Sequence, residues 1–339
     1  MTEINNENKD KIAKIIQKYL ENNPVIVLGS GASIPYGLPS MSELSKLLKE
    51  KITPIDDKSG TKFLSDLEKT NDLEKSLQNI ELSQDLLVVV VREIWNFMNE
   101  KDFELYNKFL NDYSSFSLQK MFAKLLQSSS KHVKVVTTNY DRIAEYAGDL
   151  CGANVYTGFS GRYILNFGQR YFSNALNQER VDVWKVHGSL DWFKNGDKVF
   201  SSPISKEIPE NSIPLMVTPG IAKYQQTHSD PYRTIISNAD DALVNASCFL
   251  CIGYGFNDEH IQPKLIQQIK QKDIPIVVVV KELSSAGKEL LLKKKTRSVV
   301  LEENGLVKTK ISFFEENDLC SIDLDGSYWQ VEHFLNLWF

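Results

Sequence analysis

Short apolar runs alternate with segments of helical spacing along most of this chain. Short runs rich in apolar residues, typical of buried strands, lie at Val25–Leu28, Val133–Thr137, Val181–Val186, Leu215–Thr218, Cys248–Ile252 and Ile276–Val280. Apolar residues recur with helical spacing in Lys9–Leu20, Ser40–Glu50, Arg142–Cys151, Tyr232–Ala246, Glu259–Gln271 and Ala286–Lys295. This alternation predicts an α/β fold, a Rossmann-like parallel sheet with helices on both faces.

The pattern changes between residues 53 and 131, where glycine and short buried runs are rare. Helical spacing there predicts helices at Leu64–Ile80, Ser83–Asn99, Asp102–Asn111 and Leu118–Gln127. We therefore predict that residues 1–50 and 131–310 form one α/β domain, interrupted by a helical insertion or subdomain at 51–130. Residues 311–339 are predicted to be a C-terminal segment that packs on the core or makes oligomer contacts.

Composition narrows the class of protein. The chain has 339 residues, of which 42% are hydrophobic, so it can bury a sizeable core. The net charge of −5 argues against a surface devoted to binding nucleic acid. The polar N-terminus lacks the pattern of a signal peptide, and the apolar runs are much shorter than the roughly 20 residues of a membrane span. We expect a soluble cytoplasmic protein.

A glycine-rich turn follows the first predicted strand. Gly29, Ser30, Gly31, Ala32 and Ser33 lie between that strand and a helix, where backbone amides could approach the phosphates of a dinucleotide. The sequence lacks the third small residue and the later acidic residue of the usual dinucleotide fingerprint, and it also lacks the Gly-Lys-Ser/Thr of a P-loop. A purely structural glycine turn is the alternative.

Two polar residues close the next predicted strand, in the run Thr137-Thr138-Asn139-Tyr140-Asp141. Asn139 and Asp141 are two positions apart, so an extended backbone would project both side chains to the same side. Together they could hold a sugar hydroxyl, an amide or a water. The alternative is that one of them merely caps the following helix.

Residues that could take part in catalysis or ligand binding lie at two further strand ends. His187, followed by Gly188, ends a predicted strand, and its position suits a general base, although a lone histidine is more often structural. Another glycine turn, Gly253-Tyr254-Gly255-Phe256-Asn257-Asp258, follows a later strand and offers polar groups to a ribose or phosphate. His260 is predicted to lie in the next helix, in a solvated or capping role.

The cysteines do not predict a metal site or a disulfide framework. There are four of them, Cys151, Cys248, Cys251 and Cys320, and only Cys248 and Cys251 have CxxC spacing. Residues three apart on a strand point to opposite faces, so that pair could not chelate one metal ion. We expect no metal cofactor.

The four strand-end motifs, in this order, resemble those of the sirtuin family. The GSGAS turn with the downstream Pro35 is similar to its glycine-alanine loop, TTNYD to its TQNID-type segment, and His187-Gly188 to its catalytic His-Gly; GYGFND resembles its later ribose-contacting loop. Within the family, the chain resembles the prokaryotic sirtuin-like NADases of antiphage defence more than the protein deacylases. It lacks the two CxxC pairs of the deacylase zinc module, Thr138 and Tyr140 depart from the usual segment, and GYGFNDEHI is typical of the defence branch.

The resemblance implies hydrolysis of NAD+, as substrate, to ADP-ribose and nicotinamide. Asn139 would position the attacking water or the ribose, His187 would act as general base, and Asp141 would organise the nicotinamide pocket. The implied cofactor-binding residues are Gly29, Ser30, Gly31, Ala32, Ser33, Thr138, Gly253 and Tyr254. Departure of nicotinamide leaves an oxocarbenium-like sugar, which needs positioning and shielding more than a strong nucleophile.

Two other activities are open on the same fold. One is an NAD-dependent protein deacylase, and the other is a catalytically silent subunit that binds NAD or ADP-ribose and regulates a partner. The resemblance also implies an effector that depletes NAD+ on infection, as a homo-oligomer with a partner from the same defence operon. A HerA-type ATPase is the first expectation, with a short Argonaute or a nucleotide-sensing subunit as alternatives. We expect no direct contact with nucleic acid or membrane.

Overall fold

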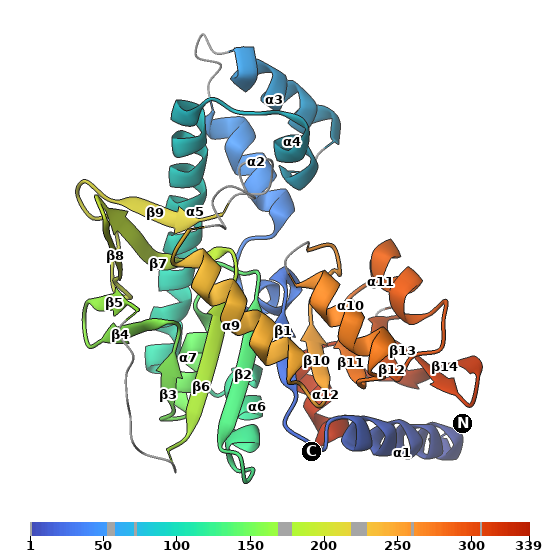
Figure 1. The fold of residues 1–339 in the computed structure, drawn as a ribbon. Coiled ribbons are helices and arrows are strands. Elements are labelled where there is room, and N and C mark those ends of the chain that lie inside the picture. Colours follow the sequence, from blue (N-terminus) through green and yellow to red (C-terminus); the bar gives the residue numbers. More distant parts are fainter. Residues whose placement is uncertain are drawn as a thin grey trace.

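A mostly parallel sheet forms the centre of the molecule (Figure 1). The computed structural model describes residues 2–52, 58–70, 73–168, 178–217, 229–258, 261–305 and 307–339. In those residues the sheet has the order β14-β13-β12-β11-β10-β1-β2-β6-β3, parallel from β12 to β3 and antiparallel across β12, β13 and β14. Its strands are β1 (Val25–Leu28), β2 (His132–Thr137), β3 (Asn154–Tyr156), β6 (Arg180–Lys185), β10 (Phe249–Ile252), β11 (Ile276–Val279), β12 (Ser298–Glu303), β13 (Lys308–Glu315) and β14 (Asp318–Asp325).

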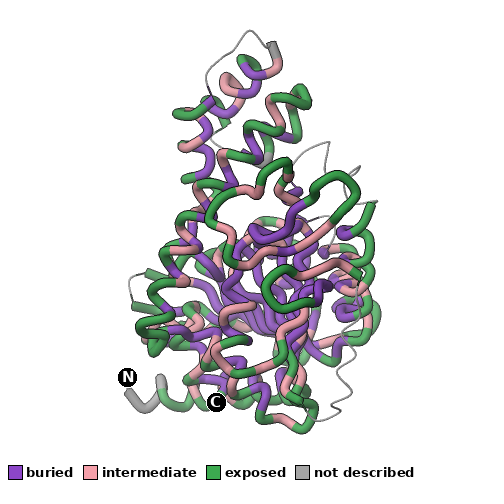
Figure 2. The backbone as a smooth tube through the Cα atoms, turned by 90° about the vertical axis from the view of Figure 1, so that its left-hand side faces the viewer, coloured by how far each residue is buried: buried purple, intermediate pink, exposed green. Residues whose placement is uncertain are grey.

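Helices cover both faces of this sheet, as the sequence predicts. One face packs against α1 (Thr2–Tyr19), α6 (Ser117–Leu126), α7 (Ile143–Leu150) and α12 (Val331–Trp338), and the other against α9 (Tyr232–Val244), α10 (Gln262–Gln271) and α11 (Ser285–Leu291). Because side chains alternate along a strand, Ile26 joins the first core and Val27 the second. Figure 2 shows the buried residues of the chain gathered in the middle of the molecule. The predicted Rossmann-like α/β fold is confirmed.

The cysteine geometry follows from the same alternation. Cys248, directly before β10, lies in the core on the α1 side, and Cys251 of β10 lies in the core on the α9 side. The CxxC spacing therefore places the two thiols on opposite faces of the sheet. No group of three or more His, Cys, Asp or Glu side chains that could hold a metal ion occurs in the described part of the chain.

A second, antiparallel sheet stands beside the first, which the sequence did not predict. It has the order β4-β5-β8-β7-β9 and consists of β4 (Phe159–Gly161), β5 (Leu165–Phe167), β7 (Gly188–Asn195), β8 (Lys198–Ser201) and β9 (Ile213–Met216). The run predicted as a strand at 215–218 is part of β9, and it pairs with β7 and not with the parallel sheet. Gly188, with a φ of +87°, turns the chain away directly after β6. Residue 218 of that run lies outside the described residues.

Helices α2 (Met41–Lys51), α3 (Lys58–Thr70) and α4 (Leu73–Asn79) lie at the top of the molecule in Figure 1, and the long helix α5 (Gln84–Asn111) runs from them down past the small sheet. They share a third core with Leu190, Phe193 and Met216 of that sheet. Two boundaries were predicted wrongly. The helices expected at 83–99 and 102–111 are one continuous helix, α5, and the one expected at 64–80 is divided into α3 and α4.

The remaining helices and the C-terminal segment belong to the main core. Leu105 and Phe109 at the end of α5 pack with α6 under the sheet, although both helices lie in the predicted insertion. Strands β13 and β14 extend the main sheet, and α12 packs beside α1 (Figure 1). A helix long and apolar enough to cross a membrane is not found among the described residues.

A buried ion pair connects α5 to the start of α7. Asp102 accepts hydrogen bonds from Arg142 through the side-chain Nε at 2.7 Å and the backbone N–H at 3.0 Å, and Nη2 of the same arginine is 2.6 Å from the carboxylate. Both residues are almost fully buried. Arg142 directly follows Asp141, so this pair anchors the end of the polar TTNYD run to α5.

Removal of one partner of this pair should be costly. We expect Asp102→Ala to lower the free energy of unfolding by about 3–5 kcal/mol, because it leaves the Arg142 guanidinium buried without its carboxylate. Glu104→Ala is the matched control, since it breaks an exposed pair with Lys101 on the same helix and should leave the free energy of unfolding close to the wild-type value. Urea unfolding of the two variants measures both values, and equal losses would contradict this account.

Candidate active site

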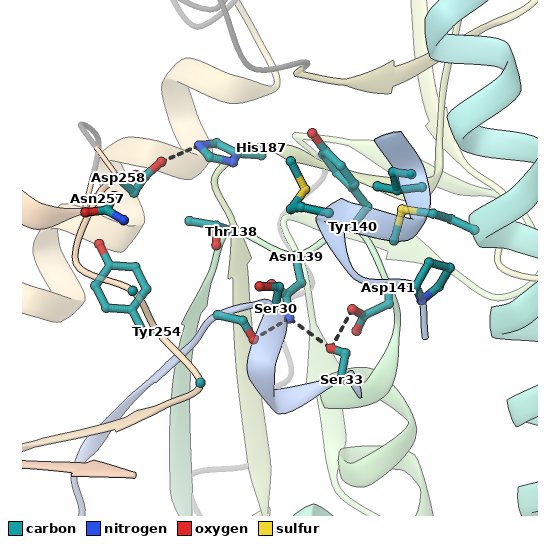
Figure 3. Close-up of a pocket in the computed structure, with 17 residues that line it drawn as sticks. Ser30, Ser33, Thr138, Asn139, Tyr140, Asp141, His187, Tyr254, Asn257 and Asp258 are labelled. Atoms are coloured by element: carbon teal, nitrogen blue, oxygen red, sulfur yellow. Dashed lines mark hydrogen bonds and ion pairs between the residues drawn. The ribbon is translucent and has the colours of Figure 1, made fainter. Parts of the chain in front are cut away.

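Four loops meet at the carboxyl ends of the parallel strands and line one pocket (Figure 3). They follow β1, β2, β6 and β10, the four neighbouring strands in the middle of the sheet. Ligands of open α/β sheets bind at this edge, where the strand order reverses. The lining residues are Gly29, Ser30, Ser33, Pro39, Met41, Leu44, Met98, Thr138, Asn139, Tyr140, Asp141, His187, Gly253, Tyr254, Gly255, Asn257 and Asp258.

The two glycine turns touch each other backbone to backbone. Gly29 N–H donates to the carbonyl of Ile252 at 3.0 Å, and Gly31 N–H donates to that of Gly253 at 3.2 Å. A Cβ on Gly29 would overlap the Gly253 carbonyl oxygen, and a Cβ on Gly253 would overlap the backbone of Gly31 and Ala32. Gly253 also has a φ of +59°. The glycines are therefore required for close packing, whatever the pocket binds.

The glycine turn does not lead directly into an α-helix. Two short 3₁₀ turns, η1 (Ser30–Ala32) and η2 (Ile34–Tyr36), come first, and α2 begins only at Met41. Pro35 lies inside η2, and Gly37, with a φ of +89°, ends it in the left-handed region. Ser40 and Glu43 form a capping box at the start of α2. The α-helix N-terminus is thus at Met41, eight residues beyond Ser33.

The close packing predicts different outcomes for two glycines of one loop. Gly253→Ala should destabilise the protein by about 2 kcal/mol or more, because alanine is strained at positive φ and its Cβ would meet backbone atoms. Gly255→Ala should change stability by about 0.5 kcal/mol or less, since the nearest atom to its Cβ would be Asn257 Nδ2 at 3.5 Å. Thermal unfolding compares them, and similar melting temperatures would contradict the proposed backbone contact.

Asn139 and Asp141 converge on the glycine turn through Ser33. Asn139 Nδ2 donates to the Gly29 carbonyl at 2.9 Å and to Ser33 Oγ at 2.9 Å, and Ser33 Oγ donates to Asp141 Oδ2 at 2.7 Å (Figure 3). Asp141 Oδ1 also accepts the N–H of Ile143, so the capping alternative is realised as well. Burial raises the pKa of the Asp141 carboxyl, and the nearby Lys185 ammonium and the Ser33 hydrogen bond oppose that rise.

Lys185 fixes the TTNYD loop from beneath and was missed by the sequence analysis. Its fully buried ammonium donates to the backbone carbonyls of Tyr140, at 3.1 Å, and Asp141. It also pairs with Glu145 at 2.9 Å. Burial raises the pKa of Glu145 to about 7, against the opposing charge of Lys185. The signal was present in the sequence: a lysine in the predicted strand Val181–Val186, two residues before the candidate histidine.

His187 is paired with a carboxylate, which the sequence analysis also missed. Its Nε2 lies 2.9 Å from Oδ2 of Asp258, at the end of the GYGFND turn (Figure 3). The two side chains are 12% and 9% exposed, so the pair is largely shielded from water. His260, two residues later, lies outside the described residues.

The structure thus brings most of the predicted residues to one pocket. The predicted residues that line it are Gly29, Ser30, Ser33, Thr138, Asn139, Asp141, His187, Gly253 and Tyr254. Gly31 and Ala32 do not line the pocket, because Gly31 contacts Gly253 and Ala32 packs into the core. The helical segments add an apolar wall that the sequence analysis did not anticipate, formed by Met41, Leu44 and Met98. The pocket is therefore lined both by polar groups from the strand-end loops and by apolar side chains from α2 and α5.

Comparison with known proteins assigns the family. The model of the SIR2-like domain matches residues 133–304, just over half of the chain. The chain belongs to the SIR2-like domain family. The match spans the TTNYD loop, His187 and the GYGFND turn, which are three of the four loops around the pocket.

Solved structures of Sir2 proteins are similar over most of the chain, at low identity. One, described under the mechanism and regulation of Sir2 enzymes, is 15% identical, with 84% of this chain and 90% of that chain covered and a TM-score of 0.43. A serine-to-alanine mutant of a Sir2 homologue in complex with ADP-ribose is 14% identical, with 80% and 86% covered and a TM-score of 0.44. No curated protein matches the sequence.

Proposed function

We propose that this protein hydrolyses NAD+ at the bond between nicotinamide and ribose, and that it acts as an NAD-depleting effector of antiphage defence. The observation that supports this most is the meeting of Asn139, Asp141 and His187 with two glycine turns in one pocket. Membership of the SIR2-like family and the resemblance of the four motifs to sirtuin-like NADases support it further. NAD+ would be the substrate.

The reaction assigns a role to each group. Water would attack the anomeric carbon of the ribose as the glycosidic bond breaks, and the bonding electron pair would leave with nicotinamide. His187 would accept the proton from water or from a ribose hydroxyl. Because Asn139 Nδ2 already donates to Gly29 and Ser33, its Oδ1 is the atom that would accept a hydrogen bond from water or ribose.

The remaining residues would bind and orient the dinucleotide. The turn at Gly29 and Ser30 would approach the phosphates, and Gly253 with Tyr254 would meet the adenosine-side ribose. Asp141 would face nicotinamide, held in place by the Ser33 hydroxyl and the Ile143 N–H. Because departure of nicotinamide leaves an oxocarbenium-like ribose, catalysis would depend on positioning and shielding that ribose more than on a strong nucleophile.

The test is to follow NAD+, nicotinamide and ADP-ribose by chromatography, with the purified protein alone and with proteins that co-purify from its host. We expect His187→Ala and Asn139→Ala to reduce the rate at least about 100-fold, because each removes a group that acts on the reacting atoms. His132→Ala is the matched control, since His132 pairs with Asp182 outside the pocket, and it should keep the wild-type rate within about twofold.

Three results would contradict the proposal. Unchanged NAD+ in every wild-type sample would favour a silent binding subunit. Release of nicotinamide only when an acylated lysine peptide is added, with acyl-ADP-ribose as the product, would favour a deacylase. Equal rates for wild type and His187→Ala would place the chemistry elsewhere.

A further inference from the structure

The contact between His187 and Asp258 joins two strands that are not neighbours. Asp258 belongs to the loop after β10, and His187 follows β6, while β1 and β2 lie between these strands. Three interstrand steps of about 4.8 Å separate β10 from β6 by about 14 Å. The pair therefore spans the loops that follow β1 and β2, the loops that carry Gly29 and Asn139.

Asp258 is held in place by its own loop. Its Oδ1 accepts the backbone N–H of Ile261 at 3.0 Å, and its backbone carbonyl accepts that of Gln262 at 3.0 Å, at the start of α10. Oδ2 is directed to His187 Nε2 at 2.9 Å. The residue is only 8% exposed, so little water competes for the carboxylate. Asp258 thus has one oxygen anchored to the backbone and one oxygen on the imidazole.

The pair lies at one end of the pocket, away from the bonds of Asn139, Ser33 and Asp141 at the other end (Figure 3). The negative charge of Asp258, 2.9 Å from Nε2, favours a proton on that nitrogen through the ion pair, so the neutral ring would carry its lone pair on Nδ1. The contact also limits rotation of the ring.

We propose that Asp258 is a positioning residue for the reaction, and that it acts by holding the His187 imidazole in one orientation and one tautomer. This role rests on the proposed NAD+ hydrolysis. Asp258 does not itself act on the reacting atoms. It acts through His187, and the turn that carries it, GYGFND, thereby links the glycine-turn side of the pocket to the base.

Asp258→Asn is the informative variant because its side-chain oxygen can still accept the Ile261 N–H, so the fold at the start of α10 is kept. The amide is uncharged and cannot hold the Nε2 proton while it caps the backbone. We expect kcat for NAD+ cleavage to fall about 10- to 100-fold, with KM within about threefold of wild type, since the substrate contacts are unchanged.

Asp182→Asn is the matched control. Asp182 also lies against a histidine, His132, at 3.0 Å and with a similarly buried carboxylate, but it pairs with Arg180 as well and lies outside the pocket. This variant should keep the wild-type kcat within about twofold. The melting temperatures of both variants show whether a lower kcat results from a destabilised fold.

A second readout does not depend on turnover. Long-range proton–nitrogen NMR of the protein labelled at histidine nitrogens, with His187 assigned through His187→Gln, reports which ring nitrogen carries the proton. We expect the Nε2–H form in the wild type at alkaline pH and a mixture of tautomers in Asp258→Asn.

The failures of the two proposals are distinguishable. If the wild type never cleaves NAD+, the proposed function fails, and the positioning role fails with it. If the wild type cleaves NAD+ but Asp258→Asn retains full kcat, only the positioning role is overturned. It is also overturned if kcat falls while the His187 tautomer stays as in the wild type, because Asp258 would then act by another route.

Discussion

The backbone contact between the turns after β1 and β10 is the constraint on which the rest of the site depends. Gly29 and Gly253 approach so closely that no side chain fits between them, and two amides of the first turn donate to carbonyls at the end of the other strand. This contact brings the two halves of the sheet together at the strand order reversal. It fixes where Ser33 lies on one side and where the GYGFND turn begins on the other.

The polar groups are then held by hydrogen bonds that run between loops. Ser33 joins the glycine turn to Asn139 and Asp141, and buried Lys185 holds the backbone carbonyls of the TTNYD loop. Such buried groups are costly unless they are fully paired, so their bonds restrict the loop to one arrangement. A site that is rigid before the ligand arrives loses less entropy when it binds.

Much of this could be predicted from the sequence, because the carboxyl ends of parallel strands meet at one edge. The positions of Asn139, Asp141 and His187 at strand ends were sufficient to place them around a common pocket. The pairing of His187 with Asp258 could not be read in the same way, because it depends on two loops meeting above the strands that separate them. The small sheet was missed because a lone glycine does not show that the chain turns sharply at Gly188, between β6 and β7. α5 was divided in the prediction at its polar residues near Glu100, although the helix continues through them.

The central claim is that water, and not an acylated lysine, receives the ribose from NAD+ in this pocket. The most direct measurement is a proton NMR time course of NAD+ with the protein and its co-purifying proteins, without any peptide, in buffer that contains methanol as a competing acceptor. The account predicts nicotinamide in an amount equal to the sum of ADP-ribose and methyl ADP-ribose, with none of the three formed by His187→Ala beyond the uncatalysed rate. NAD+ that stays intact until an acylated peptide is added, followed by an acyl-ADP-ribose product, would contradict it.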